Sequence, residues 1–378
     1  MSSIVNISPM MFAPECNDIR VNATQDLEVN ITIVTSDGVE RYNSSCIYTP
    51  VNNEVEFGDL GKLVNKCILA MGAMRSIVLG TEVSPTATLT ITLPNEEPEA
   101  VTASSTVYYC TAGNVAQPHN FSVFATQLRK RRICPDMSVC PVWIPVMNTE
   151  VEYSITLHVV YVENGVQVEV DFQQAVPSAA VRFAYLNAAL PGIVKAKLGT
   201  ALFNRVKVYE YKLSLWLDGV CTDSIEFEVD HRNYPEQSQW HFLNTFGLVE
   251  ALTMRGHNKE THTLETTIGR AGWYEVRMDD DLQREFESHS GWITRKEQRQ
   301  YAELYRSPVV SAIINGNGDA RYVIITDISV EYSFPSNEPQ GFSVKWKYAD
   351  HRQQWYADVV AQIAGRNIFD STFSFVFD

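Results

Sequence analysis

Trp240–Gly247, with the sequence WHFLNTFG, opens the most informative part of this chain. A helix start signal follows at Trp292–Glu297 (WITRKE), where Thr294 and Glu297 have the T-x-x-E spacing of a capping box. The helix should end just before Pro308, because a proline disfavours helical geometry in the residue that precedes it. We therefore expect one short helix in this part of the chain.

The residues after this helix have the composition of β-strands. Pro308–Ile314, Tyr322–Tyr332 and Gly341–Tyr348 are rich in β-branched and aromatic residues. The first two are joined through Asn315–Asp319 (NGNGD), which is typical of a hairpin turn. Its alternating oxygen donors resemble a calcium loop, but the closing bidentate Glu is missing from the register. The last third of the chain is therefore expected to form a β-rich module.

The N-terminal segment shows a hairpin and a helix. Leu27–Val34 alternates apolar and polar residues and ends at Ser36–Gly38 (SDG), which predicts a hairpin. Asp59 is placed to cap the helix that follows. The apolar residues at helical spacing in that helix are Leu60, Leu63, Val64, Cys67, Ile68 and Met71. Pro94–Glu99 (PNEEPE) has the composition of an exposed acidic linker, and we place a domain boundary near it.

The middle segment is patterned as hairpins. Tyr153–Val162 and Val166–Phe172 flank Glu163–Gly165 (ENG), and Asn-Gly is a strong hairpin signal because both central residues of a type I′ turn need positive φ. Tyr209–Leu217 and Ser224–Asp230 repeat the arrangement across Asp-Gly. Strands at this spacing are typical of a β-sandwich.

Chain length supports two or three domains, since 378 residues exceed the size of a typical single domain. We predict a mainly β, multi-domain protein with β-sandwich-like domains. The predicted parts are an N-terminal β-rich domain with one amphipathic helix (1–100), a β-sandwich-like domain (101–230) and a C-terminal β-rich assembly module with one short helix (231–378).

The charge of the chain argues against nucleic acid as a partner. A formal net charge of -15 repels phosphate backbones and anionic membrane surfaces. The basic run Arg129–Arg132 (RKRR) is expected to be a solvated loop, although in an assembly it could meet the acidic face of a neighbour.

The compartment is predicted from the N-terminus and the cysteines. Met1–Asn6 lacks the pattern of a signal peptide, and the sequence has no apolar run of about 18 residues that could span a bilayer. The seven cysteines form an odd, scattered set, which favours reduced core thiols over disulfides. We expect a protein that is made and stays soluble in a cytoplasm, without membrane insertion.

No motif specifies a reaction. The triplet Asp-His-Arg occurs at Asp230–Arg232 and Asp350–Arg352, but neighbours on a strand point to opposite faces, so each triplet is expected to be solvent-facing polar sequence. Asp279–Asp281 is typical of surface charge, and the spacing of Cys134 and Cys140 fits no common zinc finger. We predict no catalytic, metal-binding or cofactor-binding residues, and no enzyme activity.

The order of motifs in the last third resembles the C-terminal module of a family of structural proteins from Bacteroidetes phages and prophages. The motifs that carry the resemblance are Phe227–Asp230, Trp240–Gly247, Trp292–Glu297, Ser307–Val309, Val323–Asp327 and Trp346–Ala349. The N-terminal segment Ser8–Ile19 is similar to the opening of the family as well. Where family members often have paired Gly, this chain has Gly247-Leu248, and its extension beyond Trp355 is unlike the pattern.

The resemblance implies a non-enzymatic virion structural protein, a tail or tail-tip (baseplate-like) component assembled in the host cytoplasm. Its partners would be copies of itself, in a symmetric homo-oligomer, and other virion proteins. A receptor- or carbohydrate-binding adhesin at the tail tip, which attaches to a host-surface glycan or receptor, and a head or neck component are the alternatives. A hydrolase acting on envelope polymers would need a convergent carboxylate pair, which the sequence does not reveal.

The candidate interface residues are aromatic. They are Trp240, Phe242, Phe246, Trp292, Phe373, Phe375 and Phe377. Aromatic clusters of this kind are more often core than interface. The last three lie in the alternating tail Phe369–Asp378, which could be a core strand or could add to the sheet of a neighbouring subunit.

Overall fold

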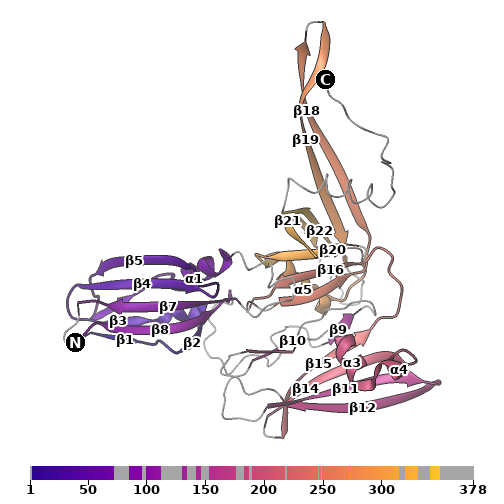
Figure 1. Ribbon diagram of the computed structural model, residues 1–378, viewed down its shortest axis with the longest axis horizontal. Coiled ribbons are helices and arrows are strands. Elements are labelled where there is room, and N and C mark those ends of the chain that lie inside the picture. The colour runs from indigo at the N-terminus through magenta and orange to yellow at the C-terminus, as the bar shows by residue number, and fades with distance from the viewer. Residues whose placement is uncertain are drawn as a thin grey trace, which may run out of the picture.

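The chain folds into three β-rich domains (Figure 1). The computed structural model describes residues 2–71, 85–95, 99–111, 130–133, 142–145, 153–175, 183–186, 190–217, 219–245, 247, 249–271, 273–314, 320–330 and 341–349. Three large sheets account for most of the described strands. The predicted fold class, mainly β and multi-domain, is confirmed.

The first domain is built on a five-stranded sheet in the order β2-β8-β7-β4-β5, with a three-stranded sheet β1-β3-β6 beside it. Its elements are β1 Ser3–Val5, β2 Met10–Phe12, η1 Ala13–Asp18, β3 Arg20–Asn22, β4 Leu27–Thr35, β5 Glu40–Tyr48, β6 Glu54–Glu56, α1 Leu60–Leu69, β7 Thr86–Leu93 and β8 Val101–Tyr108. The predicted β4–β5 hairpin and the amphipathic helix α1 are both present. Asp59 does not cap α1 as predicted: its backbone is left-handed (φ 57°) and its carboxylate pairs with Lys62 at 2.9 Å.

The domain boundary predicted near residue 100 is wrong. β8 pairs antiparallel with β7, with Leu93 opposite Val101, so Pro94–Glu99 lies between two neighbouring strands of one sheet. β8 also pairs in parallel with β2 at the start of the chain. The first domain therefore continues to about residue 110, where Tyr109 still belongs to its core.

The second domain is a five-stranded sheet in the order β12-β11-β14-β15-β9. Its elements are β9 Lys130–Ile133, β10 Val142–Pro145, β11 Tyr153–Glu163, β12 Val166–Ala175, β13 Phe183–Leu186, α3 Leu190–Leu198, α4 Thr200–Phe203, β14 Lys207–Leu217 and β15 Val220–Val229, with β10 and β13 paired separately. Both predicted hairpins are confirmed, and Asn164 and Gly165 have the positive φ values, 51° and 81°, that the turn requires.

The basic run is not a loop. Lys130–Ile133 forms β9, which pairs in parallel with the end of β15. The register places Lys130 opposite Glu226 and Arg132 opposite Glu228. Opposite charges across the pair favour the strand, which explains the failure of the loop prediction.

The third domain is a seven-stranded sheet in the order β17-β16-β20-β21-β22-β19-β18, packed against one helix. Its elements are β16 Ser238–Leu243, β17 Val249–Met254, β18 Asn258–Ala271, β19 Tyr274–His289, α5 Arg295–Arg306, β20 Val310–Ile314, β21 Arg321–Val330 and β22 Phe342–Tyr348. The predicted capping box is present, because the Thr294 hydroxyl accepts from the Glu297 amide and the Glu297 carboxylate accepts from the Thr294 amide.

Three hydrophobic cores meet at the short strand β17. Val249 packs in the core of the first domain, Ala251 in that of the second, and Leu252 and Met254 in that of the third. Alternate residues of a strand point to opposite faces, so β17 is buried on both sides along its whole length. This strand connects the three domains through packed side chains.

Candidate interaction site

A long β-hairpin projects from the third domain, and we call residues 258–285 of it the arm. From Thr261 onward the arm extends beyond the rest of the sheet. Figure 1 shows β18 and β19 extending away from the other strands. β19 pairs with β22 only over Phe286–His289, whereas β18 and β19 pair with each other from Asn258 to the tip. Within the described ranges, no third strand pairs with the arm.

The arm exposes apolar side chains. Trp273 at the tip is 100% exposed, and the adjacent Tyr274 is largely exposed as well. Leu264 and Ile268, both on β18, are exposed by 49% and 64%. Exposed apolar groups of this size on a projecting element are typical of a surface that binds a partner.

The two strands of the arm differ in charge. β18 has two acidic residues, Glu260 and Glu265, and two basic ones, Lys259 and Arg270. β19 has six acidic residues and only two basic ones, and its acidic residues include Asp279–Asp281. The sequence of β19 is therefore acidic, while that of β18 is balanced in charge.

The arm is anchored at its base by aromatic packing. Phe286 stacks on Trp346 with ring centroids 4.4 Å apart, and Trp346 meets Trp240 edge-to-face at 5.7 Å. The Trp346 indole N–H donates to Ser288 Oγ at 3.0 Å. The base of the hairpin is therefore packed against the third core.

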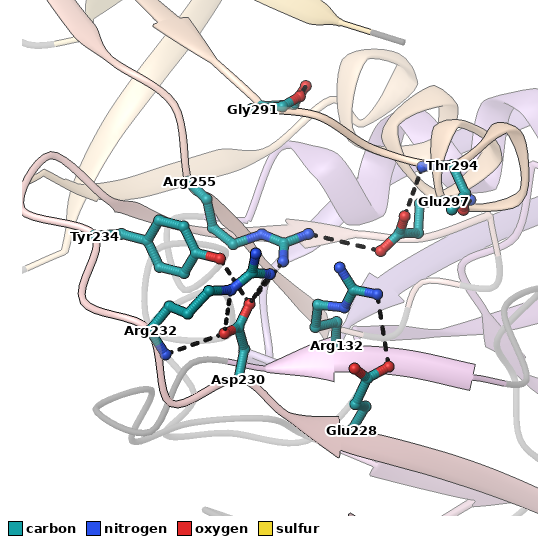
Figure 2. Close-up of polar contacts among 10 residues, drawn as sticks. Arg132, Glu228, Asp230, Arg232, Tyr234, Arg255, Gly291, Thr294 and Glu297 are labelled. Atoms are coloured by element: carbon teal, nitrogen blue, oxygen red, sulfur yellow. Dashed lines mark hydrogen bonds and ion pairs between the residues drawn. The ribbon is translucent and has the colours of Figure 1, made fainter. Parts of the chain in front are cut away.

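An ionic cluster with a buried Asp230–Arg255 pair lies where the second domain passes into the third (Figure 2). The Asp230 carboxylate accepts from Arg232 Nη2 at 2.8 Å, from Tyr234 Oη at 2.7 Å and from Arg255 Nη1 at 3.0 Å. The Asp230 and Arg255 side chains are only 5% and 9% exposed. Arg255 also faces Glu297 of the capping box at 3.7 Å, so the cluster links the end of β15 to α5.

The electrostatics of this cluster favour the charged forms of Asp230 and Arg255. The hydrogen bond from Arg232 is the largest factor that holds the pKa of Asp230 well below its ordinary value, and Tyr234 adds to the effect against the opposing influence of burial. Arg255 precedes the arm by three residues. Its amide donates to the carbonyl oxygen of Ser290, which directly follows β19 at the base of the hairpin. The cluster thus fixes the position of the base of the arm.

Two histidines stack where the arm begins and ends. The rings of His257 and His289 lie 5.3 Å apart and nearly parallel. The Gly291 amide donates to His289 Nδ1 at 3.0 Å. Burial lowers the pKa of His289, and the neighbouring His257 adds to this effect.

The predicted interface residues divide into three groups. Trp240 and Phe242 are fully buried in the third core, so the interface prediction is corrected for them: neither has surface to offer a partner. Trp292 is 71% exposed just before α5. Phe246 and the tail residues Phe373, Phe375 and Phe377 lie outside the described residues.

Other sequence predictions are also resolved. Asp230 is not solvent-facing, because Arg232, Tyr234 and Arg255 surround its carboxylate. Cys16, Cys67 and Cys110 are buried free thiols as predicted, whereas Cys46 and Cys221 are free but exposed. Residues 315–319, 350–352, Cys134 and Cys140 fall outside the described part, and for Asp279–Asp281 the structure describes only their strand.

The described residues contain no group of three or more His, Cys, Asp or Glu side chains that could hold a metal ion. In the same part of the chain, no helix is both long enough and apolar enough to cross a membrane.

Comparisons with known proteins do not place the chain in a family. No protein-family model matches it, and neither does any curated protein. A crystal structure of CBD12 from CALX1.2 is 10% identical, with 60% of this chain and 98% of that chain covered, at a TM-score of 0.17. A structure concerning host-cell-surface retention of a 1.5-MDa bacterial ice-binding adhesin is 11% identical, with 75% of this chain and 96% of that chain covered, at a TM-score of 0.14. The TM-scores are too low for either likeness to support an argument.

The arm is the candidate site that the sequence did not reveal. Its strands are polar on much of both faces, so they lack the simple apolar alternation that marks a half-buried strand. One signal was present: the β-branched content of Thr261–Ile268, a few residues before a Gly-Trp pair, is typical of a hairpin.

Proposed function

We propose that this chain is a non-enzymatic virion structural protein, a tail or tail-tip component that works by self-association and by docking to other virion proteins. The observation that carries the proposal is the arm, which offers a partner exposed apolar side chains and strand edges that no other described strand pairs with. The order of motifs from Phe227 to Ala349, which resembles phage structural proteins, supports the same function.

The body of the molecule suits this role. A projecting element transmits force to its own base, and here the base is held by the Asp230–Arg255 pair and by the Phe286–Trp346 stack. The strand β17 then links the arm's domain to the other two cores. A subunit built in this way can hold neighbours in fixed positions.

The test is to find the protein in particles. Phage particles induced from the cell that encodes the chain would be purified by density gradient, analysed by mass spectrometry and labelled with antibody for electron microscopy. The proposal predicts stoichiometric protein and label at one end of the tail. Label on the head or neck would support the head or neck alternative, and particles without the protein would contradict a structural role.

A tail-tip adhesin is the second candidate, and the arm's tip favours it. Trp273 and Tyr274 are adjacent and exposed, and aromatic rings of this kind can stack on sugar rings. A glycan array probed with the purified protein and with Trp273→Ala would test it. Binding that Trp273→Ala abolishes would support an adhesin, and an array without binding would leave the structural role as the better account.

A further inference from the structure

We infer that the arm binds a second copy of this chain, by antiparallel pairing of the two β18 edges across a two-fold axis near Thr266. This inference names the partner of the arm and rests on the proposed self-association. The pairing would produce a four-stranded sheet in the order β19-β18-β18-β19. Both copies would contribute the same surface, as a two-fold contact requires.

The first observation is the exposed backbone of β18. Among the described strands it lies at the edge of its sheet, and it runs over 14 residues with side chains that are mostly exposed. Isolated two-stranded hairpins are marginally stable in water, and three or more strands are usually needed for independent stability. A second arm paired along β18 would supply the missing strands.

The second observation is that β19 is protected against pairing more strongly than β18. β19 has Asp279–Asp281 together with a bulge at Met278, where the register passes from Thr267 opposite Asp279 to Ile268 opposite Arg277. Charges and bulges are the means by which proteins block an edge strand. β18 contains no proline and no consecutive acidic residues. Of the two described edges, β18 is therefore the more open to a further strand.

A copy of the same strand fits the charge of β18. Two chains with a net charge of -15 repel each other over most of their surface, yet β18 itself is balanced, with two acidic and two basic residues. With Thr266 on the axis, Glu265 lies opposite Thr267 of the other copy, so acidic residues do not oppose each other. The same register brings Leu264 of each copy opposite Ile268, which would bury the exposed apolar residues of both strands.

A cysteine on the axis tests the geometry. Thr266→Cys in the full-length chain should form a disulfide between copies under mild oxidation, because directly opposed residues in an antiparallel pair have Cβ atoms close enough to be bridged. Tryptic digestion and mass spectrometry should find the peptide in which the two introduced thiols are joined, despite the exposed native Cys46 and Cys221. Gln283→Cys, on the outer strand β19, is the matched control and should give no peptide joined through its own introduced thiol.

A charge at the apolar contact tests the association itself. Ile268→Lys should halve the mass measured by light scattering after size exclusion, because the introduced lysine of each copy would then face Leu264 of the other. Ile47→Lys is the control, since Ile47 is an exposed isoleucine on the edge strand β5 of another sheet, and it should leave the mass unchanged.

The outcomes separate this inference from the proposed function. An oligomer that persists in Ile268→Lys, or the absence of the cross-linked peptide from oxidised Thr266→Cys, overturns pairing through β18 and leaves self-association standing. A parent protein that is monomeric at every concentration overturns both.

Discussion

At the scale of single residues, the Asp230–Arg255 pair is the clearest energetic element of the structure. Both side chains are almost inaccessible to water, and Arg255 would keep its buried charge if Asp230 were neutralised. Removal of one partner of a buried pair typically costs about 3–5 kcal/mol. Asp230→Asn should lower the free energy of unfolding by about that amount in urea titrations at pH 7. Glu228→Gln, at the more exposed pair with Arg132, should cost under about 1 kcal/mol.

The pH dependence of the stability that Asp230 contributes follows from the direction in which its pKa is shifted. The folded pKa of Asp230 lies below its unfolded value, so its contribution is present above about pH 4 and is lost as the pH falls through the folded pKa. The difference between the parent chain and Asp230→Asn should therefore shrink below about pH 4. A difference that stays constant down to about pH 2 would contradict the assignment.

His241 should make the protein sensitive to acid. Burial lowers the pKa of His241 to about 4, and neither ring nitrogen has a hydrogen-bond partner among the described residues. An unfolded histidine takes up its proton near pH 6.5, so stability should fall as the pH drops from about 6.5 to 4, by up to about 3 kcal/mol. His241→Leu should flatten this part of the stability profile. The same change at the exposed His262 should not, and equal slopes in all three proteins would refute the idea.

At this scale, residue types can be identified from the sequence, but their positions in the fold cannot. The aromatic residue Trp240 could be identified but not placed, because core and interface residues have the same composition. Asp230 was read as solvent-facing because its partner Arg255 is 25 residues away in the sequence, and this proximity exists only after β16 and β17 have paired.

At the scale of elements, Gly247 controls how the β16–β17 connection meets the first domain. Its φ is +73°, and a Cβ there would lie 2.7 Å from the Tyr109 carbonyl oxygen. Gly247→Ala should therefore lower the free energy of unfolding by more than the roughly 1 kcal/mol that a left-handed backbone costs an alanine without a steric clash. Gly165→Ala is the matched control, with φ +81° and no atom within 4 Å of the added carbon. If urea denaturation gave both variants the same loss in free energy of unfolding, the close approach at Tyr109 would be contradicted.

Local signals predicted elements well where the chemistry was local. The capping box at Thr294 and the Asn164-Gly165 turn satisfy backbone requirements within a few residues, and both were predicted. Two predictions failed because distant strands decide the outcome. β9 forms through its pairing with β15, and Val101–Tyr108 joins the first sheet through β2 and β7. The arm was missed because its strands bury little of either face.

At the scale of the whole molecule, the cores are coupled through the third sheet. Leu243 belongs to β16 yet packs in the core of the first domain, whereas Leu252 of β17 packs in the third core. Leu243→Ala should lower the free energy of unfolding by about 2–5 kcal/mol. It should also speed amide hydrogen exchange in β4 and β7 of the first domain. Leu252→Ala should leave exchange in β4 and β7 unchanged. Faster exchange confined to the third sheet in both variants would show that the domains are not coupled.

The central claim is that this body presents its arm for association with other copies. Light scattering after size exclusion, applied to the full-length protein over a wide concentration range, tests it most directly. The account predicts a discrete species with an even number of copies that persists on dilution. A single-chain mass at every concentration would contradict it.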